Sequence, residues 1–235
     1  MKIKIFFPLL LIAASILSSC KKSDDPAPSS TTTNPTANGG SYLPMTTGNT
    51  WNYHGESFSY TSSSTGNTQS YGGTTYKELK QINSNSTTPS YGYINQDGNK
   101  YYTYAVLGTT PVKMKLIDLD LPFGNTWVTK IASNVYTDVT YTFKVSGTGL
   151  TRTVNGIDYS NVISIQLNTT WQLSATGVAF YTQYGFTAAE IQGLQDGIAE
   201  SNFVQTTYYS NNVGVIEQTS PTAGLNIQLL SSTIY

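Results

Sequence analysis

The sequence predicts an all-β protein, an antiparallel meander that forms a curved sheet, a half-barrel or a sandwich, with one short helix near residues 188–200. Three observations predict this fold. Apolar and polar side chains alternate in several segments, turn-forming residues separate these segments, and Tyr, which favours strands, occurs 18 times in 235 residues. Because 12% of the residues are aromatic, a wholly disordered protein is excluded.

The low charge of the chain excludes further classes. Ser, Thr and Asn supply 79 of the 235 residues, whereas Lys and Arg supply 12 and Asp and Glu 13. Such a composition does not suit a coiled coil or a long helical bundle. From Cys20 onwards the chain has 10 basic and 13 acidic side chains, a net charge of −3, so we expect no nucleic-acid partner.

Residues 1–19 are predicted to be a signal peptide. Lys2 and Lys4 precede an apolar run from Ile5 to Leu17, which is too short for a bilayer that needs about 20 residues. The run ends in Leu17-Ser18-Ser19-Cys20, which resembles the lipobox of bacterial lipoproteins. That resemblance implies that the Cys20 thiol carries diacylglycerol and that cleavage leaves Cys20 as the acylated first residue. The alternative is a buried structural cysteine.

The residues after Cys20 are predicted to hold the protein at the cell surface. Cys20 is the single cysteine, so it has no partner for an internal disulfide, and two or three acyl chains anchor a protein durably. Lys21-Lys22-Ser23-Asp24-Asp25 resembles the lipoprotein export signal of Bacteroidota. The resemblance implies a lipid-anchored protein of the bacterial outer membrane that faces the cell exterior; the alternative is a solvated charge cluster.

Residues 20–41 are predicted to form the lipidated cysteine and a flexible tether, and residues 42–235 a single β domain. From Pro26 to Ser41 there is no aromatic or large aliphatic side chain to offset the entropy of ordering the backbone. The composition changes at Tyr42, and the remaining 194 residues suffice for one sizeable domain.

Alternation and turn chemistry predict the strands of this domain. In residues 139–145 every odd position is apolar and every even one polar. The alternation recurs at Ile157, Tyr159, Ile163, Ile165 and Leu167 and in residues 225–229. Asp97-Gly98-Asn99 and Asn155-Gly156 are predicted hairpin turns. Thr187 and Glu190 form a capping-box pattern, and Ile191 begins an apolar helical spacing, which together predict the single helix.

The sequence Leu-Pro…Gly-Asn-Thr-Trp occurs twice, in residues 43–51 and, two residues shorter, in residues 121–127. Both copies are predicted to begin strands, either by convergent turn chemistry or by duplication. With the segment Tyr208 to Glu217, they resemble a class of Bacteroidota lipoproteins to which no activity is assigned. The resemblance implies an all-β lipoprotein domain and brings no catalytic residues. The expected architecture, a curved sheet with a helix across its mouth, is also similar to that of half-barrel lipoprotein carriers. This similarity concerns the fold alone.

The sequence predicts no catalytic residue, no metal ligand and no cofactor. His54 is the single histidine, so a zinc site lacks its usual ligands and a catalytic triad has one candidate base, which we expect to be half exposed. No glycine-rich phosphate loop is present. Asp118 and Asp120 alternate in a strand-like segment, residues 116–121, and a carboxylate glycoside hydrolase on this pair is the remote enzymatic alternative.

Aromatic side chains are the remaining candidates for binding. Flat rings on a sheet stack on sugars or line an apolar cavity, although tyrosines on a sheet need no ligand. The predicted function is therefore a non-enzymatic surface lipoprotein, a tethered binding or interaction module whose ligand is a glycan or a lipid. The alternative is a structural or accessory subunit of an envelope complex, with a protein partner. The candidate ligand-facing aromatics are Trp51, Tyr53, Tyr91, Tyr93, Tyr101, Tyr102 and Tyr104.

Overall fold

The computed structural model describes residues 40–86, 88–107, 110–132 and 135–235. The first half of the described chain contains the strands β1 (Thr50–Gly55), β2 (Ser59–Tyr71), β3 (Thr74–Asn83), β4 (Ser90–Asp97), β5 (Lys100–Leu107) and β6 (Thr110–Asp118). The second half contains β7 (Thr126–Ala132), β8 (Thr137–Val154), β9 (Ile157–Leu173), the helices α1 (Ala175–Gln183) and α2 (Ala188–Ala199), and the strands β10 (Phe203–Ser210), β11 (Gly214–Ser220) and β12 (Leu225–Thr233).

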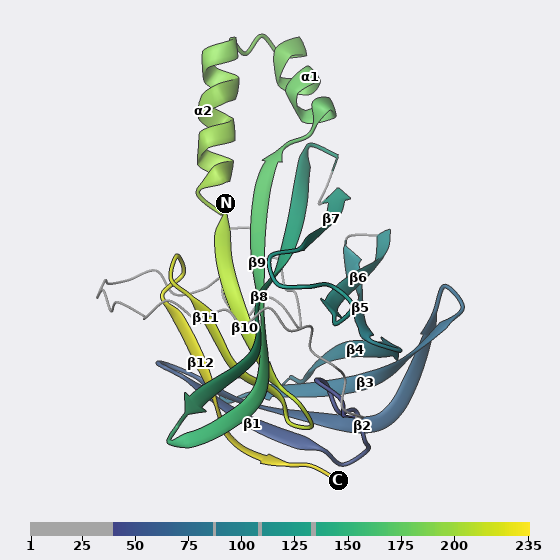
Figure 1. Ribbon diagram of the computed structural model, residues 1–235. Helices are drawn as coiled ribbons and strands as arrows, with labels where there is room; N and C mark the ends of the chain where they lie inside the picture. Colours follow the sequence, from purple (N-terminus) through teal and green to yellow (C-terminus); the bar gives the residue numbers. More distant parts are fainter. Residues whose placement is uncertain (1–39, 87, 108–109, 133–134) are drawn as a thin grey trace.

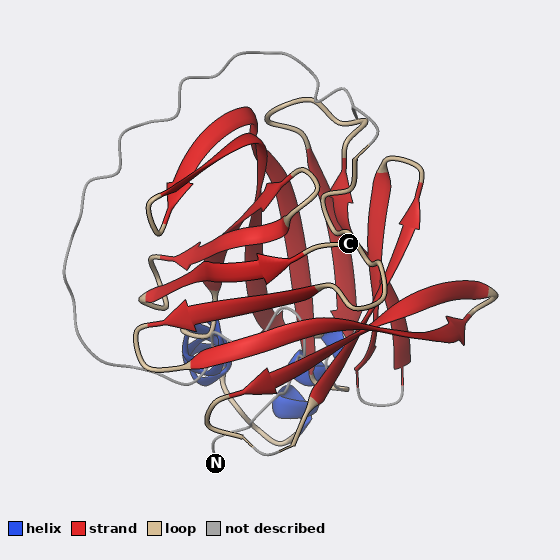
Figure 2. Cartoon of the chain, turned by 90° about the horizontal axis from the view of Figure 1, so that it is seen from below, coloured by secondary structure: helices blue, strands red, loops and turns tan. Residues whose placement is uncertain are grey.

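The strands form one 12-stranded antiparallel sheet in the order β6-β5-β4-β3-β2-β1-β12-β11-β10-β9-β8-β7. Apart from β6 and β7, which form the two edges, strands that follow one another in sequence are neighbours, and β1 pairs with β12, so the predicted meander is confirmed. The sheet curls into a nearly closed, barrel-like shape (Figures 1 and 2). Its two edges, β6 and β7, approach each other, and the indole Nε1 of Trp127 donates to the backbone oxygen of Lys115 at 2.8 Å across this seam.

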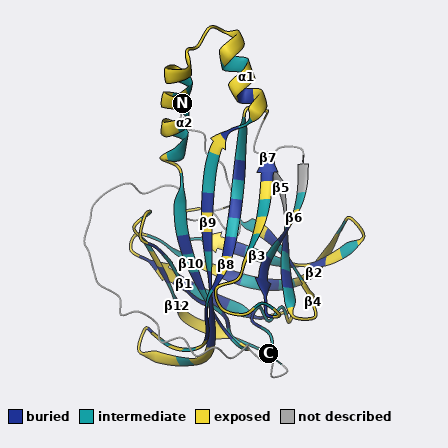
Figure 3. Cartoon of the chain, turned by 45° about the horizontal axis from the view of Figure 1, so that its top comes forward, coloured by how far each residue is buried: buried dark blue, intermediate teal, exposed yellow. Residues whose placement is uncertain are grey.

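The main core lies on the inner face of the curled sheet, because the alternating apolar residues point inward. Val139, Tyr141, Phe143 and Val145 of β8 are each at most 3% exposed, which confirms the alternation predicted for residues 139–145. Figure 3 shows buried positions along β8 and β9, in contrast to the exposed helices. Hairpin turns lie where predicted, and at the β8–β9 turn Asn155 and Gly156 both have positive φ, 50° and 78°, as a tight two-residue turn requires.

The far ends of β8 and β9 bend past β10 and pack against β11 and β12 (Figure 1). Register shifts between Val145 and Arg152 allow this bend. Arg152 pairs with Glu217 of β11 at 2.5 Å, and the Asn155 side chain donates to the backbone oxygen of Leu229 at 2.7 Å. A second buried cluster, which includes Val154, forms beside these contacts.

The two Leu-Pro…Gly-Asn-Thr-Trp segments precede β1 and β7, as predicted, and make matching backbone hydrogen bonds. The N–H of Gly48 donates to the oxygen of Ser64, whose own N–H donates to the oxygen of Asn49, at 3.0 and 2.9 Å. The N–H of Gly124 donates to Val145, whose N–H donates back to Asn125, at 2.8 and 3.0 Å. Both glycines have positive φ, 92° and 87°, so each repeated glycine serves the same turn geometry.

The helices form a hairpin that projects from the ends of β9 and β10 (Figure 1). The prediction of a helix near residues 188–200 is confirmed by α2, in which Thr187 and Glu190 make the reciprocal bonds of a capping box. The expectation of a single helix is wrong, because α1 precedes α2. Ser174 caps α1 by accepting a hydrogen bond from the N–H of Gly177 at 3.0 Å. No described helix has the length and apolar character to span a membrane.

Candidate functional site

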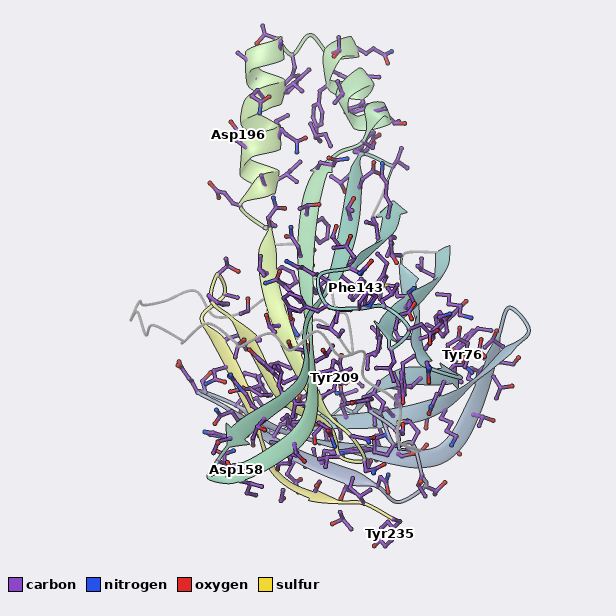
Figure 4. All side chains as sticks on the ribbon, viewed as in Figure 1. Tyr76, Phe143, Asp158, Asp196, Tyr209 and Tyr235 are labelled. Atoms are coloured by element: carbon purple, nitrogen blue, oxygen red, sulfur yellow. The ribbon has the colours of Figure 1, made fainter. Side chains whose placement is uncertain are left out.

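The curled sheet holds a partly open cavity of about 80 Å³. Its walls come from strands on both sides of the β1–β12 junction and from the segment before β1, and they are mainly apolar and aromatic. Figure 4 shows two wall residues, Phe143 and Tyr209, in the middle of the molecule. Six of the apolar or aromatic residues that line the cavity are Trp51, Tyr53, Tyr60, Phe143, Tyr209 and Ile227.

Two groups of polar side chains also line the cavity. On β2 and β3, the Gln81 side-chain nitrogen donates to the Ser62 hydroxyl at 3.1 Å, and both residues are buried. On β10 and β11, the side-chain nitrogens of Gln205 and Gln218 lie 3.4 and 3.3 Å from the Thr207 hydroxyl. An apolar cavity with a few convergent polar groups is the usual form of a small-molecule site.

Strand register places the second polar group among apolar neighbours. Gln205 and Thr207 pair with Leu167 and Ile165 of β9, and Tyr209 pairs with Ile163. The three β10 residues alternate with residues of the other face, so they point into the cavity together. Sequence analysis missed Gln205 and Thr207, because polar residues of a strand are ordinarily assigned to its solvent-facing side.

The cavity is electrically neutral. None of the described residues that line it carries a charged side chain. Burial raises the pKa of the Tyr60 and Tyr209 phenols, and burial also raises the pKa of Tyr53 well above its ordinary value. The Tyr53 hydroxyl donates to the backbone oxygen of Val215 at 3.0 Å. A buried charge without a partner is strongly disfavoured, so this site suits a neutral molecule.

The structure divides the aromatic residues that sequence analysis singled out. Trp51 and Tyr53 lie in the cavity wall. Tyr101 is fully buried in the main core, outside the cavity lining, and its hydroxyl accepts a hydrogen bond from the N–H of Tyr42 at 3.0 Å. The other four, on β4 and β5, alternate with residues of the inner face and therefore belong to the outer face of the sheet: Tyr91, Tyr93, Tyr102 and Tyr104.

On this outer face several tyrosines pack on one another and form an outer tyrosine cluster of Tyr71, Tyr76, Tyr93 and Tyr104. The rings of Tyr71 and Tyr104 are stacked with centroids 3.6 Å apart, and Tyr93 meets the Tyr71 ring edge-on at 5.4 Å. Tyr76 is 1% exposed beneath them and lies away from the cavity residues Phe143 and Tyr209 in Figure 4. These ring faces are therefore occupied by other tyrosines.

The two remaining outer rings differ in their surroundings. The Lys113 ammonium lies 4.0 Å from the centroid of the Tyr102 ring, so a cation covers one face of that ring. Tyr91 is 41% exposed. Of the four outer-face candidates, Tyr91 therefore has the most accessible ring.

The carboxylates of Asp118 and Asp120 do not share a cleft. The expectation that both lie on one strand is wrong, because β6 ends at Asp118 and Asp120 lies in the following turn. Asp118 is buried and pairs with Lys115, whereas Asp120 is exposed and pairs with Lys100. A hydrogen bond from the Asn99 amide, followed by the bond from Lys100, lowers the pKa of Asp120. A glycosidase acid needs a raised pKa, and neither side chain lines the cavity.

His54 lies on β1, with its side chain exposed. Within the described ranges, no group of three or more His, Cys, Asp or Glu side chains is placed to hold a metal ion. The predicted signal peptide, the lipidation site Cys20 and the export signal from Lys21 to Asp25 lie outside the described residues.

Comparisons with known proteins give one structural likeness. No protein-family model matches the sequence, and a search of curated proteins finds no match. A solved structure of a protein from Parabacteroides distasonis, described as a candidate lipoprotein, superposes with a TM-score of 0.47. The match covers 83% of this chain and 99% of that chain at 11% sequence identity, and nothing below rests on it.

Proposed function

We propose that this protein is a non-enzymatic, lipid-anchored protein of the bacterial outer membrane that binds a small apolar molecule inside its curled sheet. The resemblance of Leu17-Ser18-Ser19-Cys20 to a lipobox and the charge cluster behind it support the anchor and its outward orientation. The observation that carries the binding function is the neutral cavity, with its apolar walls and two buried polar groups. Between the two ligand classes that the sequence left open, this cavity favours an apolar molecule over a glycan.

The size and lining of the cavity support this choice. A cavity needs roughly 10–15 Å³ to hold one water molecule. This cavity, of about 80 Å³, therefore has room for more than a single water. A sugar needs many polar partners, whereas most side chains that line the cavity are apolar. The outer tyrosines offer few free ring faces for stacking, because they cover one another.

The test of binding uses the full-length chain in detergent and benzofuran, a small, neutral aromatic probe. Leu225 lines the cavity, so Leu225→Trp fills it, whereas Leu230 lies on the same strand and is 49% exposed. Titration calorimetry should show benzofuran binding to the unchanged chain and to Leu230→Trp, and at least tenfold weaker binding to Leu225→Trp. If the heats are equal in all three chains, they report only the partition of benzofuran into detergent micelles, and the proposal is refuted.

The test of location uses intact cells. Replacing Asp24 and Asp25 by Ala should reduce cleavage of the protein by an added protease, because the export signal is lost, while Cys20→Ser should release the protein from the membrane fraction. Unchanged protease cleavage would refute the predicted export signal and would not affect the binding proposal.

A second function, an accessory subunit of an envelope complex, is favoured by the helical hairpin. Its aromatic side chains contact one another but remain partly open: Tyr184 is 68% and Phe186 39% exposed. This proposal expects a stoichiometric protein partner after mild solubilisation of membranes. The partner should be lost in a Tyr184→Ser, Phe186→Ser double variant and kept in Leu225→Trp.

A further inference from the structure

One residue of the cavity wall, Gln205, has a buried polar atom that the fold leaves unpaired. Gln205 is 3% exposed and lines the cavity, and its side-chain oxygen Oε1 is buried with no hydrogen-bond partner among the described residues. Most buried polar side-chain atoms in proteins are paired, so an unpaired oxygen at a cavity wall requires an explanation. A bound molecule that donates a hydrogen bond supplies one.

The neighbours of Gln205 determine which hydrogen bond is missing. The Nε2 atoms of Gln205 and Gln218 both donate to the Thr207 hydroxyl oxygen, whose two lone pairs accept them. Within this cluster, Gln205 Oε1 is the buried side-chain atom that has no hydrogen-bond partner among the described residues.

The opposite polar group of the cavity differs in this respect. Gln81 donates to Ser62 at 3.1 Å, and neither side chain has an unpaired buried atom among the described residues. The cavity wall thus has a residue with an unpaired acceptor on β10, a hydrogen-bonded pair on β2 and β3, and apolar and aromatic side chains such as Tyr60 and Ile227 around them. This asymmetry orients a ligand, with its polar end at Gln205.

From this arrangement we infer that Gln205 Oε1 is a specificity-determining acceptor for a neutral, mainly apolar molecule that carries one O–H or N–H group, such as a phenol, an indole or a short alcohol. The inference rests on the proposed binding function and adds the chemical class of the ligand. The donor group binds Gln205, Thr207 and Gln218 hold the amide in place, and the apolar body fills the remaining space. Charged ligands are disfavoured, because none of the described residues that line the cavity supplies a counter-charge.

The test compares two probes of the same shape on the full-length chain in one detergent. Indole has an N–H donor, and benzofuran has an oxygen in its place. One hydrogen bond to a buried acceptor corresponds to about a tenfold difference in affinity. Calorimetry should therefore show indole binding about tenfold more tightly than benzofuran to the unchanged chain.

Matched variants assign this preference to one residue. Gln205→Met keeps the length of the side chain and removes the acceptor, so the affinity ratio of indole to benzofuran should fall to about one. Gln81→Met makes the same change at the opposite wall and should keep the ratio near ten. If Gln205→Met does not fold, 1-methylindole, which has lost its N–H, should bind the unchanged chain about tenfold more weakly than indole.

The outcomes separate the two proposals. A ratio near one in the unchanged chain, with benzofuran still excluded by Leu225→Trp, overturns the role of Gln205 and leaves the cavity as a binding site. If indole binds more weakly than benzofuran, the Gln205 nitrogen faces the ligand. That result also overturns the assignment of Gln205 as an acceptor. If Leu225→Trp leaves the binding of both probes unchanged, neither proposal stands.

Discussion

The cavity wall and the outer tyrosine cluster are both rich in aromatic rings, but they differ in what remains unsatisfied. In the outer tyrosine cluster, Tyr71 and Tyr104 stack on each other and cover the buried Tyr76. In the cavity, rings such as Tyr53 and Tyr209 border an open volume, and one buried amide oxygen has no partner in the described chain. An aromatic surplus therefore indicates strands and packing, whereas the proposed binding site rests on the open volume and on the unpaired polar atom of a wall residue.

Alkaline pH should destabilise the cavity wall more than the outer tyrosine cluster, because burial raises the pKa of Tyr71 and Tyr76 less than that of the inner phenols. Burial raises the pKa of Tyr53, Tyr60 and Tyr209 above the unfolded value of about 10, so the folded chain retains these protons where the unfolded chain loses them. Their contribution to stability is complete below pH of about 10 and is lost as pH rises towards the folded pKa values. Three such phenols lower the free energy of unfolding by up to about 4 kcal/mol for each pH unit.

This prediction is measured by denaturant unfolding at a series of pH values and by phenolate absorbance. Above pH of about 10, stability should fall steeply, and the buried phenols should ionise only when the chain unfolds. Stability that stays constant to pH of about 12 would mean that water reaches the inner phenols.

Truncation of the inner wall should have the next largest effect. Phe143 is 2% exposed, lines the cavity and stacks on Trp127 with centroids 5.4 Å apart. Phe143→Ala should lower the free energy of unfolding by about 3–5 kcal/mol, because it removes buried apolar area and enlarges the cavity. Thermal and denaturant unfolding measure the loss; a change below about 1 kcal/mol would show that this wall is not tightly packed.

Truncation of the outer tyrosine cluster should be milder and should spare binding. Tyr104→Ala removes the ring that stacks on Tyr71, and we expect a loss of about 1–2 kcal/mol with unchanged benzofuran affinity. Calorimetry on the same preparation measures both quantities. Loss of probe binding without a matching loss of stability would move the site to the outer face.

The smallest effect is expected at Tyr91. Its side chain is 41% exposed on β4, so Tyr91→Ala should change the free energy of unfolding by no more than about 0.5 kcal/mol. Probe binding should not change either. If the outer face captured glycans, this substitution would instead remove binding to a glycan array, which makes Tyr91 the residue that best discriminates the two ligand classes.

Much of the fold follows from local patterns. Strand β8 is predictable from its strict alternation, the β8–β9 turn from Asn155-Gly156, and α2 from the capping box at Thr187. Helix α1 escaped prediction because its residues include Thr, Val, Phe and Tyr, which favour strands. Its N-cap Ser174 is a signal, but short polar residues are too common in this sequence to stand out.

The candidate site was less predictable, because it depends on which strands are neighbours. Trp51 and Tyr53 were found through their aromatic character, whereas Gln205 and Thr207 look like solvent-facing residues until β9 and β11 flank them. The pairing of β1 with β12 joins residues from opposite ends of the described chain. No local sequence pattern encodes it. Closure of the sheet decides which face becomes the cavity wall.

The most direct test of the cavity as a binding site is a crystal structure of the full-length chain with 5-bromoindole, whose bromine is located by anomalous scattering. We predict a single strong bromine peak inside the curled sheet, with the indole N–H within hydrogen-bonding distance of Gln205 Oε1. An empty cavity, or bromine bound instead beside Tyr91 on the outer face, would show that the cavity is not the binding site.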